Sequence, residues 1–205
     1  MPDGRAPHDF EVTELAPADV AAAGALLGRA YRDNPLTVAL FGDDADVRTR
    51  VNEVAFAIRV KARAPPALAV KDGERLVGVC GFDAPGGSMI PAEDRRAMFE
   101  AWTEVGPDVG PTLMRMLQEW TRRAPKEPHW NLGPVGVAPD MQGRGLAKAM
   151  LQRFCEMMDA EEALAFLETD LAANARLYEK FGFATTESAV VEGVETWFMV
   201  REPRP

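Results

Sequence analysis

Residues 142–148 (Gln-Gly-Arg-Gly-Leu-Ala-Lys) have the residue types and spacing that most clearly suggest chemistry. Gly143 and Gly145 lie between an apolar segment typical of a strand and a helical repeat. The backbone N–H groups of such a loop point, together with the positive end of the helix dipole, at any anion above them. The loop therefore predicts a phosphate site. The alternative is a glycine-softened turn that binds nothing.

Two common nucleotide motifs are excluded at this loop. A P-loop requires Gly-Lys-Ser/Thr in register, and a dinucleotide fingerprint requires glycine where Lys148 stands. The net charge of residues 115–148 is +3, whereas that of the whole chain is −9, so the rest of the chain carries −12. This distribution favours a polyanionic cofactor together with a cationic or amine substrate. A chance cluster on solvated helix faces is the alternative. The six basic residues of this stretch, against three acidic ones, are Arg115, Arg122, Arg123, Lys126, Arg144 and Lys148.

The elements that must position the loop follow from hydrophobic periodicity and turn signals. The C-terminal half predicts a strand, the glycine loop, a long helix, an interior strand, a short helix and a final hairpin. The N-terminal half predicts a strand, two helices, a hairpin turning at Asp72-Gly73, and two more helices broken near Gly106-Pro107. The predicted ranges are strand 10–15, helices 20–31 and 46–63, strands 67–71 and 75–82, two helices within 91–123, strand 132–137, helix 143–159, strand 163–169, helix 174–181, and strands 184–191 and 194–200.

Composition narrows the class of protein. With 205 residues, 32 acidic and 23 basic, the chain has the size of one globular domain and is acidic, which argues against nucleic-acid binding. Cys80 and Cys155 lie in apolar runs and cannot form a disulfide framework. No apolar stretch is long enough to cross a bilayer, and residues 1–10 lack a signal pattern. We therefore expect a cytoplasmic protein with no membrane partner.

Two segments of the C-terminal half resemble the GNAT superfamily of N-acetyltransferases. Residues 132–139 followed by 142–147 resemble its acetyl-CoA motif, whose loop pattern is Gln/Arg-x-x-Gly-x-Gly/Ala. Residues 167–183 resemble the later strand and helix, which end in Tyr-x-x-x-Gly-Phe. Within the superfamily the chain is most similar to puromycin N-acetyltransferase and its relatives, which leaves antibiotic resistance open as a role. The segments that carry this closer likeness are 126–128, 135–137, 166–169 and 196–199.

The resemblance implies a single GNAT domain over residues 1–205, with an acetyl-CoA-binding core at about 129–183. The fold would be α/β, with a mixed, mostly antiparallel sheet of about seven strands splayed in a V and flanked by helices. Acetyl-CoA would be the cosubstrate, with its pantetheine arm between strands 132–137 and 163–169. Pro134 lacks an N–H and Gly136 lacks a side chain, which suits this strand to offering backbone groups to a ligand. The residues implied to bind the cosubstrate are Val135, Gly136, Val137, Gln142, Gly143, Arg144, Gly145, Leu146, Ala147, Lys148, Asn174 and Tyr178.

The resemblance also implies catalytic roles. An amine would attack the thioester directly, backbone N–H groups of 135–137 would orient the thioester, and Tyr178 would protonate the leaving thiolate. The alternative for Tyr178 is a core tyrosine that packs beside Phe181. Glu168 is the first candidate for the base, because a carboxylate on an interior strand can be tuned toward neutral pH. An equally open reading is that Glu168 accepts backbone hydrogen bonds and holds local structure.

His129 is a second candidate base, although a lone histidine is more often structural or solvated. We expect no metal, because His8 and His129 are the only histidines and no cluster has ligand spacing. Serine hydrolysis is excluded, because neither Ser88 nor Ser188 lies in Gly-x-Ser-x-Gly.

These observations predict an enzyme that transfers the acetyl group of acetyl-CoA to the amine of a small molecule within a ternary complex. A protein N-terminal or lysine acetyltransferase remains an alternative, because the helices that would face the substrate carry no readable motif. A catalytically silent acyl-CoA-binding module is a third reading, which the presence of Tyr178 disfavours. The expected partners are a small-molecule amine and no nucleic acid, and the expected assembly is a monomer or a homodimer.

Overall fold

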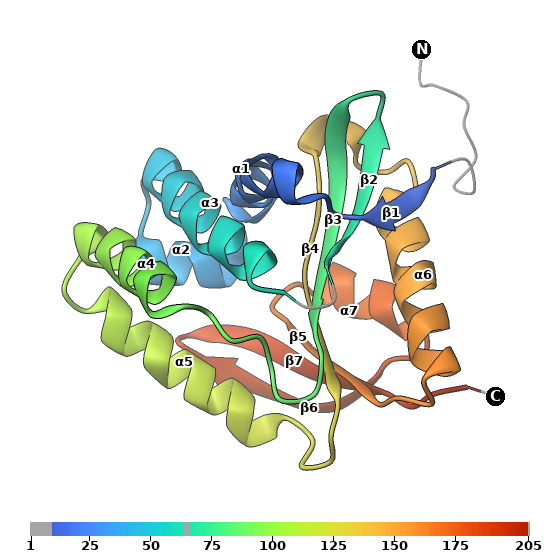
Figure 1. The fold of residues 1–205 in the computed structure, drawn as a ribbon. Coiled ribbons are helices and arrows are strands. Elements are labelled where there is room, and N and C mark those ends of the chain that lie inside the picture. The colour runs from blue at the N-terminus through green and yellow to red at the C-terminus, as the bar shows by residue number, and fades with distance from the viewer. Residues whose placement is uncertain (1–9, 64–65, 205) are drawn as a thin grey trace.

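The computed structural model describes residues 10–63 and 66–204, which form a seven-stranded mixed sheet flanked by helices (Figure 1). The strand order is β1-β2-β3-β4-β5-β7-β6, and only the β4–β5 pair is parallel. The α/β architecture with a sheet of about seven strands is thereby confirmed. The strands are β1 Val12–Glu14, β2 Leu68–Asp72, β3 Arg75–Asp83, β4 Trp130–Val137, β5 Ala165–Thr169, β6 Ala184–Val191 and β7 Val194–Arg201.

The sheet opens between β4 and β5. These strands pair only at their first residues, where Trp130 lies opposite Ala165 and Asn131 opposite Phe166. Beyond that point β4 continues its pairing with β3, and β5 continues with β7. The backbone groups on the facing edges of β4 and β5 are therefore not used in a ladder between them, which is the predicted V.

The missing side chain of Gly136 was predicted to expose backbone groups to a ligand, but in the structure it makes room for a helix. A Cβ atom at Gly136 would lie 2.6 Å from Leu27 Cδ2 and 3.3 Å from Ala30 Cβ, so the missing side chain lets helix α1 (Val20–Tyr31) pack closely on β4. Arg63 also holds this strand, since its Nη2 donates to Gly133 O at 2.6 Å. Strand β4 is thus fixed by side chains from distant segments.

Helices cover the two parts of the sheet with two separate cores. Helices α1 and α6 pack on strands β1–β4, α3 packs mainly on α1, α4 packs on α3 and α5, and α2 and α5 contact β7 and β6. Figure 1 shows α1–α5 on one side of the molecule and α6 on the other. The helices are α1 Val20–Tyr31, α2 Pro35–Phe41, α3 Ala45–Lys61, α4 Ala92–Val105, α5 Val109–Arg123, α6 Leu146–Ala160 and α7 Ala172–Glu179.

Two departures from the predicted helices have a clear backbone cause. Asn34-Pro35 was expected to end a helix, but Pro35 also begins α2, because proline is well tolerated at the first helical position. Helix α6 begins at Leu146 and not at Gly143, because Gly143 (φ 76°) and Gly145 (φ 92°) adopt the left-handed conformation. Within the described ranges, every helix is too short or too polar to span a bilayer.

Candidate active site

The glycine loop forms one wall of a cavity of about 830 Å³, here called the loop cavity. Its other walls are the end of β4, the start of α6 and one face of α7. Gln142 folds back toward β4, with its Nε2 donating to Val137 O at 3.4 Å. All of the residues predicted to bind the cosubstrate line this cavity: Val135, Gly136, Val137, Gln142, Gly143, Arg144, Gly145, Leu146, Ala147, Lys148, Asn174 and Tyr178.

The loop cavity offers donors to an anion. The first N–H groups of α6 have no partner within the helix and point past Gly145, and the helix dipole adds positive potential there. A Cβ at Gly143 would meet no atom within 4 Å, so the space above the loop is open. Arg144 and Lys148 line the same cavity and form no ion pair with any described residue. These features fit a ligand with phosphate groups.

The predicted basic island is wrong as a feature of this loop. Arg115, Arg122 and Arg123 lie on α5, which packs against β6 on the other arm of the sheet. Arg115 pairs with Glu192 at 3.3 Å, and Arg123 pairs with Glu187 at 2.9 Å. Of the six basic residues counted along the sequence, only Arg144 and Lys148 line the loop cavity.

A second cavity of about 340 Å³, here called the inner cavity, lies on the other side of the gap between β4 and β5. It shares Asn34 and Tyr178 with the loop cavity, so the two spaces meet beside Tyr178. Its lining comes mostly from apolar residues of α2–α5. These include Leu36, Leu40, Phe41, Ala55, Phe56, Met98, Trp102, Leu113, Met116, Leu117 and Trp120.

Tyr178 lies at this junction with its ring edge-on to Phe183, the ring centroids being 5.9 Å apart. The surrounding protein desolvates the hydroxyl and raises its pKa well above the ordinary 10. Nearby Tyr31 raises the pKa further. Tyr178 therefore keeps its proton at neutral pH and can act as a proton donor but not as a base.

Glu168 is the carboxylate that faces the inner cavity from β5. Burial raises its pKa from 4.5 to about 7, while the positive charge of Arg59 acts in the opposite direction. Its Oε2 atom is buried and has no hydrogen-bond partner among the described residues. The carboxylate also accepts a hydrogen bond from its own backbone N–H, as the structural reading requires, while the buried Oε2 stays free to take a proton, as the proton-acceptor reading requires.

Tyr31 is a member of the site that sequence reasoning missed. Its hydroxyl accepts the Val135 N–H at 3.1 Å, and its ring packs on Phe56 with centroids 4.8 Å apart. Burial raises its pKa to about 12. The Val135 N–H was expected to orient a thioester, but it is already engaged. Because 104 positions separate Tyr31 from Val135, no local spacing could have signalled this contact.

Asp170 also belongs to the site but is not free. It accepts hydrogen bonds from Asn34 Nδ2 at 2.8 Å and from Leu36 N at 2.7 Å. These bonds tie the start of α2 to the end of β5. Glu168 is therefore the carboxylate left to meet a substrate amine.

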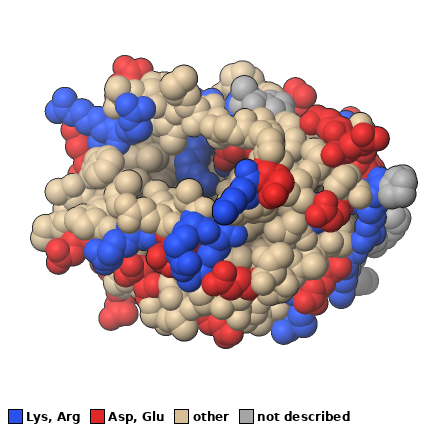
Figure 2. Space-filling model, turned by 90° about the horizontal axis from the view of Figure 1, so that it is seen from below, with Lys and Arg blue, Asp and Glu red and all other residues tan. Residues whose placement is uncertain are grey.

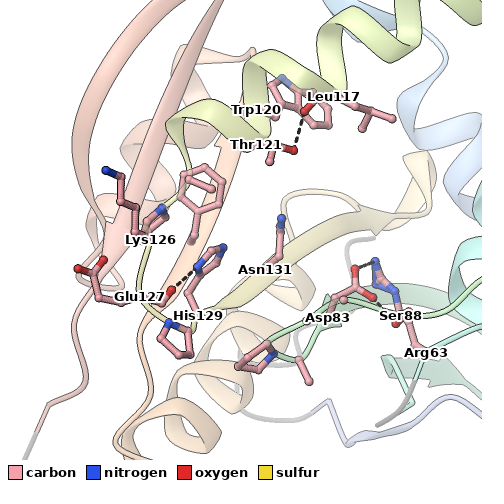
Figure 3. A pocket seen from close by; sticks show the side chains of 18 of the residues that line it. Arg63, Asp83, Ser88, Leu117, Trp120, Thr121, Lys126, Glu127, His129 and Asn131 are labelled. Carbon is pink, nitrogen blue, oxygen red and sulfur yellow. Dashed lines mark hydrogen bonds and ion pairs between the residues drawn. The ribbon is translucent and has the colours of Figure 1, made fainter.

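His129 is placed elsewhere. Its Nδ1 lies 2.8 Å from Glu127 O, and its ring contacts Phe166 edge-on at 5.6 Å. It lines a third cavity and neither of the two that meet at Tyr178 (Figure 3). The geometry therefore does not bring His129 together with Tyr178 and Glu168.

Comparisons with known proteins identify the family. The family model described as "Acetyltransferase (GNAT) family" matches residues 38–183, which is most of the chain. The chain belongs to this family, which is a family of enzymes whose cosubstrate is acetyl-CoA. This result agrees with the fold, the splayed sheet and the loop cavity.

Individual relatives are more distant. A mycothiol acetyltransferase from Saccharomonospora viridis is 28% identical over 152 residues, which cover 73% of this chain and 45% of that protein, so the chain spans less than half the length of this curated relative. Among solved structures, the histone acetyltransferase HPA2 and related acetyltransferase from Corynebacterium glutamicum is similar with a TM-score of 0.68 and 18% identity, covering 96% of this chain and 97% of that one. A GNAT acetyltransferase from Brucella melitensis in complex with acetyl-CoA has a TM-score of 0.54 and 16% identity, covering 97% and 90%.

Proposed function

We propose that the chain transfers an acetyl group from acetyl-CoA to the amine of a small molecule that binds in the inner cavity. The observation that carries this proposal is that the two cavities share Tyr178 in their linings, with Glu168, whose Oε2 has no partner among the described residues, facing the inner one. When bound, acetyl-CoA supplies the acetyl group as a thioester, which an unprotonated amine can attack directly.

The loop cavity would hold the cosubstrate. The N–H groups at the start of α6 and the side chains of Arg144 and Lys148 suit its phosphates. Asn174 lies one helical turn before Tyr178 on α7 and lines the same cavity, so its amide can hydrogen-bond the pantetheine arm.

Three side chains would handle protons at the junction. Glu168, with a pKa of about 7, accepts the proton of an incoming ammonium group. Tyr178 keeps its proton and can donate it to the departing sulfur. Tyr31 accepts the Val135 N–H with an oxygen lone pair, so its own proton remains available for an oxygen of the bound reactants.

The shape of the inner cavity supports a small acceptor. Helices α2–α5 supply most of its lining, which is largely apolar, as is usual for small-molecule sites. The likeness to puromycin N-acetyltransferase stays a prediction, and so does a role in antibiotic resistance. Acetylation of protein amines and silent acyl-CoA binding are the competing outcomes.

The test is a screen of acetyl-CoA turnover against small amines, polyamines, aminonucleosides and peptides. Thiol release gives the rate, and mass spectrometry identifies the acetylated product. We expect robust turnover on small amines. Turnover on peptide N-termini or lysines alone would overturn the small-molecule assignment, and acetyl-CoA binding without turnover of any amine would favour the silent module.

A further inference from the structure

A third cavity of about 720 Å³, here called the outer cavity, adjoins the inner cavity. The two share Arg59, Ile90, Leu117 and Trp120, so these side chains lie at the boundary between them. Figure 3 shows Leu117 and Trp120 of α5 on one side of the outer cavity and Arg63 beside Asp83 on the other. On the face seen in Figure 2, Lys and Arg side chains gather in and beside a hollow.

Charges around the outer cavity are not balanced. Arg63 pairs with Asp83 at 2.9 Å and donates to Gly133 O, so this guanidinium is engaged within the protein. Arg59 and Lys126 also line the cavity, and no described carboxylate lies within ion-pair distance of either. Asp83 and Glu127 are the acids of this lining, so three basic side chains face two acidic ones and the cavity has a small excess of positive charge.

Arg59 and Glu168 face the inner cavity together without forming an ion pair with each other. Arg59 comes from α3, and its guanidinium lies over the Phe56 ring at 5.9 Å from the centroid. Glu168 comes from β5, and its buried Oε2 has no partner. The charge of Arg59 acts on Glu168 without direct contact, so this mostly apolar cavity presents one cation and one carboxyl group, and a ligand that carries both charges in the reverse arrangement is complementary to them.

We propose that the acceptor is an amino carboxylate with an apolar body, whose amine lies against Glu168 and whose carboxylate binds Arg59. The apolar body would pack on the side chains that α4 and α5 supply, among them Met98, Trp102 and Met116. Arg59 is suited to this task because a guanidinium can bind a carboxylate with two parallel hydrogen bonds. This inference rests on the proposed acetyl transfer and names the substrate class for it.

The test compares acceptors that share one carbon skeleton. Phenylalanine, phenylalaninamide and phenethylamine form one set, and leucine with its amide and amine forms another. We expect kcat/KM for the free acid to exceed that for the amide and the amine by roughly tenfold or more, the usual scale for a hydrogen-bonded charge. Binding calorimetry with CoA in place of acetyl-CoA should give the same order without turnover.

Arg59 variants assign the preference to this residue. Arg59→Gln should bring the ratio of kcat/KM for the acid to kcat/KM for the amide and the amine down to about one, and Arg59→Lys should keep part of that ratio. The ratio is the readout because the charge of Arg59 also lowers the pKa of Glu168, so the absolute rates of all three acceptors can change together. Arg96→Gln is the matched control, because Arg96 is an exposed cation of α4 that pairs only with Glu100 among the described residues. Circular dichroism verifies that each variant is folded.

The outcomes separate the two proposals. If amines are acetylated and the acid has no advantage, or if the advantage survives Arg59→Gln, the amino carboxylate class is wrong while acetyl transfer stands. If no amine of any set is acetylated although acetyl-CoA binds, the proposed function itself fails.

Discussion

Replacing Glu168 with glutamine tests whether this carboxylate accepts a proton in the reaction or stabilises the fold through hydrogen bonds. Glutamine keeps the size of the side chain and remains neutral at every pH. In the wild type, the folded protein holds the Glu168 proton up to about pH 7, whereas an ordinary glutamate releases it near 4.5. The unfolded chain therefore loses this proton first, and stability declines as the pH rises from 4.5 to 7 and stays lower above 7.

The size of this effect follows from the same two values. The difference between about 7 and 4.5, at ~1.4 kcal/mol for each pH unit, amounts to ~3 kcal/mol. This value is an upper bound, because Glu168 lines the inner cavity, where solvent reduces the free-energy cost of its charge. Glu168→Gln should thus be more stable than the wild type by up to ~3 kcal/mol at pH 9, or roughly 6–12 °C in Tm for a chain of this size, and equal to it near pH 4.5.

Activity should change in the opposite direction. Wild-type kcat/KM should rise with pH through about 7, and Glu168→Gln should lose roughly a hundredfold in kcat together with this inflection. The charged and titratable groups that surround Glu168 are Arg59 of α3, Asp83 of β3, Tyr31 of α1, Tyr178 of α7 and Asp170. Exposed Glu161→Gln is the control for removing one negative charge.

Thermal unfolding and initial rates, both measured at several pH values, distinguish the two roles of Glu168. A variant that is less stable than the wild type at every pH would show that Glu168 holds the fold through hydrogen bonds, and the reasoning from its unpartnered oxygen would be refuted.

Substitutions at three further positions test the junction and the loop. Tyr178→Phe should lower kcat by roughly a hundredfold with little change in acetyl-CoA affinity measured by calorimetry, and wild-type turnover would leave Tyr178 as a packing residue. Gly145→Glu should abolish acetyl-CoA binding in a folded protein, whereas Gly145→Ala, which has the same backbone strain without the charge, should bind more weakly but measurably; equal affinity in the two would remove the anion site from the loop. Tyr31→Phe keeps the ring on Phe56 but leaves the Val135 N–H without its partner, so we expect a loss of ~1 kcal/mol in stability and about tenfold in kcat, and a loss of stability alone would make the contact purely structural.

The local parts of the fold were predictable from sequence. The strand before the loop, the glycines and the helix after it are contiguous, and the residues predicted to line a cosubstrate site do line one cavity. The short helix α2 was missed because proline both ends and begins helices. Periodicity reports on one element at a time, so it places secondary structure better than contacts.

The substrate side was not predictable for the same reason. Tyr31, Arg59 and Asp170 reach the inner cavity from three separate segments, and none has a spacing that marks it. The net charge of residues 115–148 wrongly predicted a basic island at the loop, because ion pairs such as Arg123 with Glu187 form between residues 64 positions apart. A charge summed along the chain therefore says little about the charge inside one cavity.

The central claim is that cosubstrate and acceptor meet beside Tyr178. A crystal structure of the protein with CoA tests it most directly. The account predicts the pyrophosphate against the N–H groups of Gly145 and the start of α6, and the CoA sulfur within hydrogen-bonding distance of the Tyr178 hydroxyl, on the side that opens to Glu168. A sulfur atom that lay away from Tyr178, with the inner cavity sealed from it, would contradict the account.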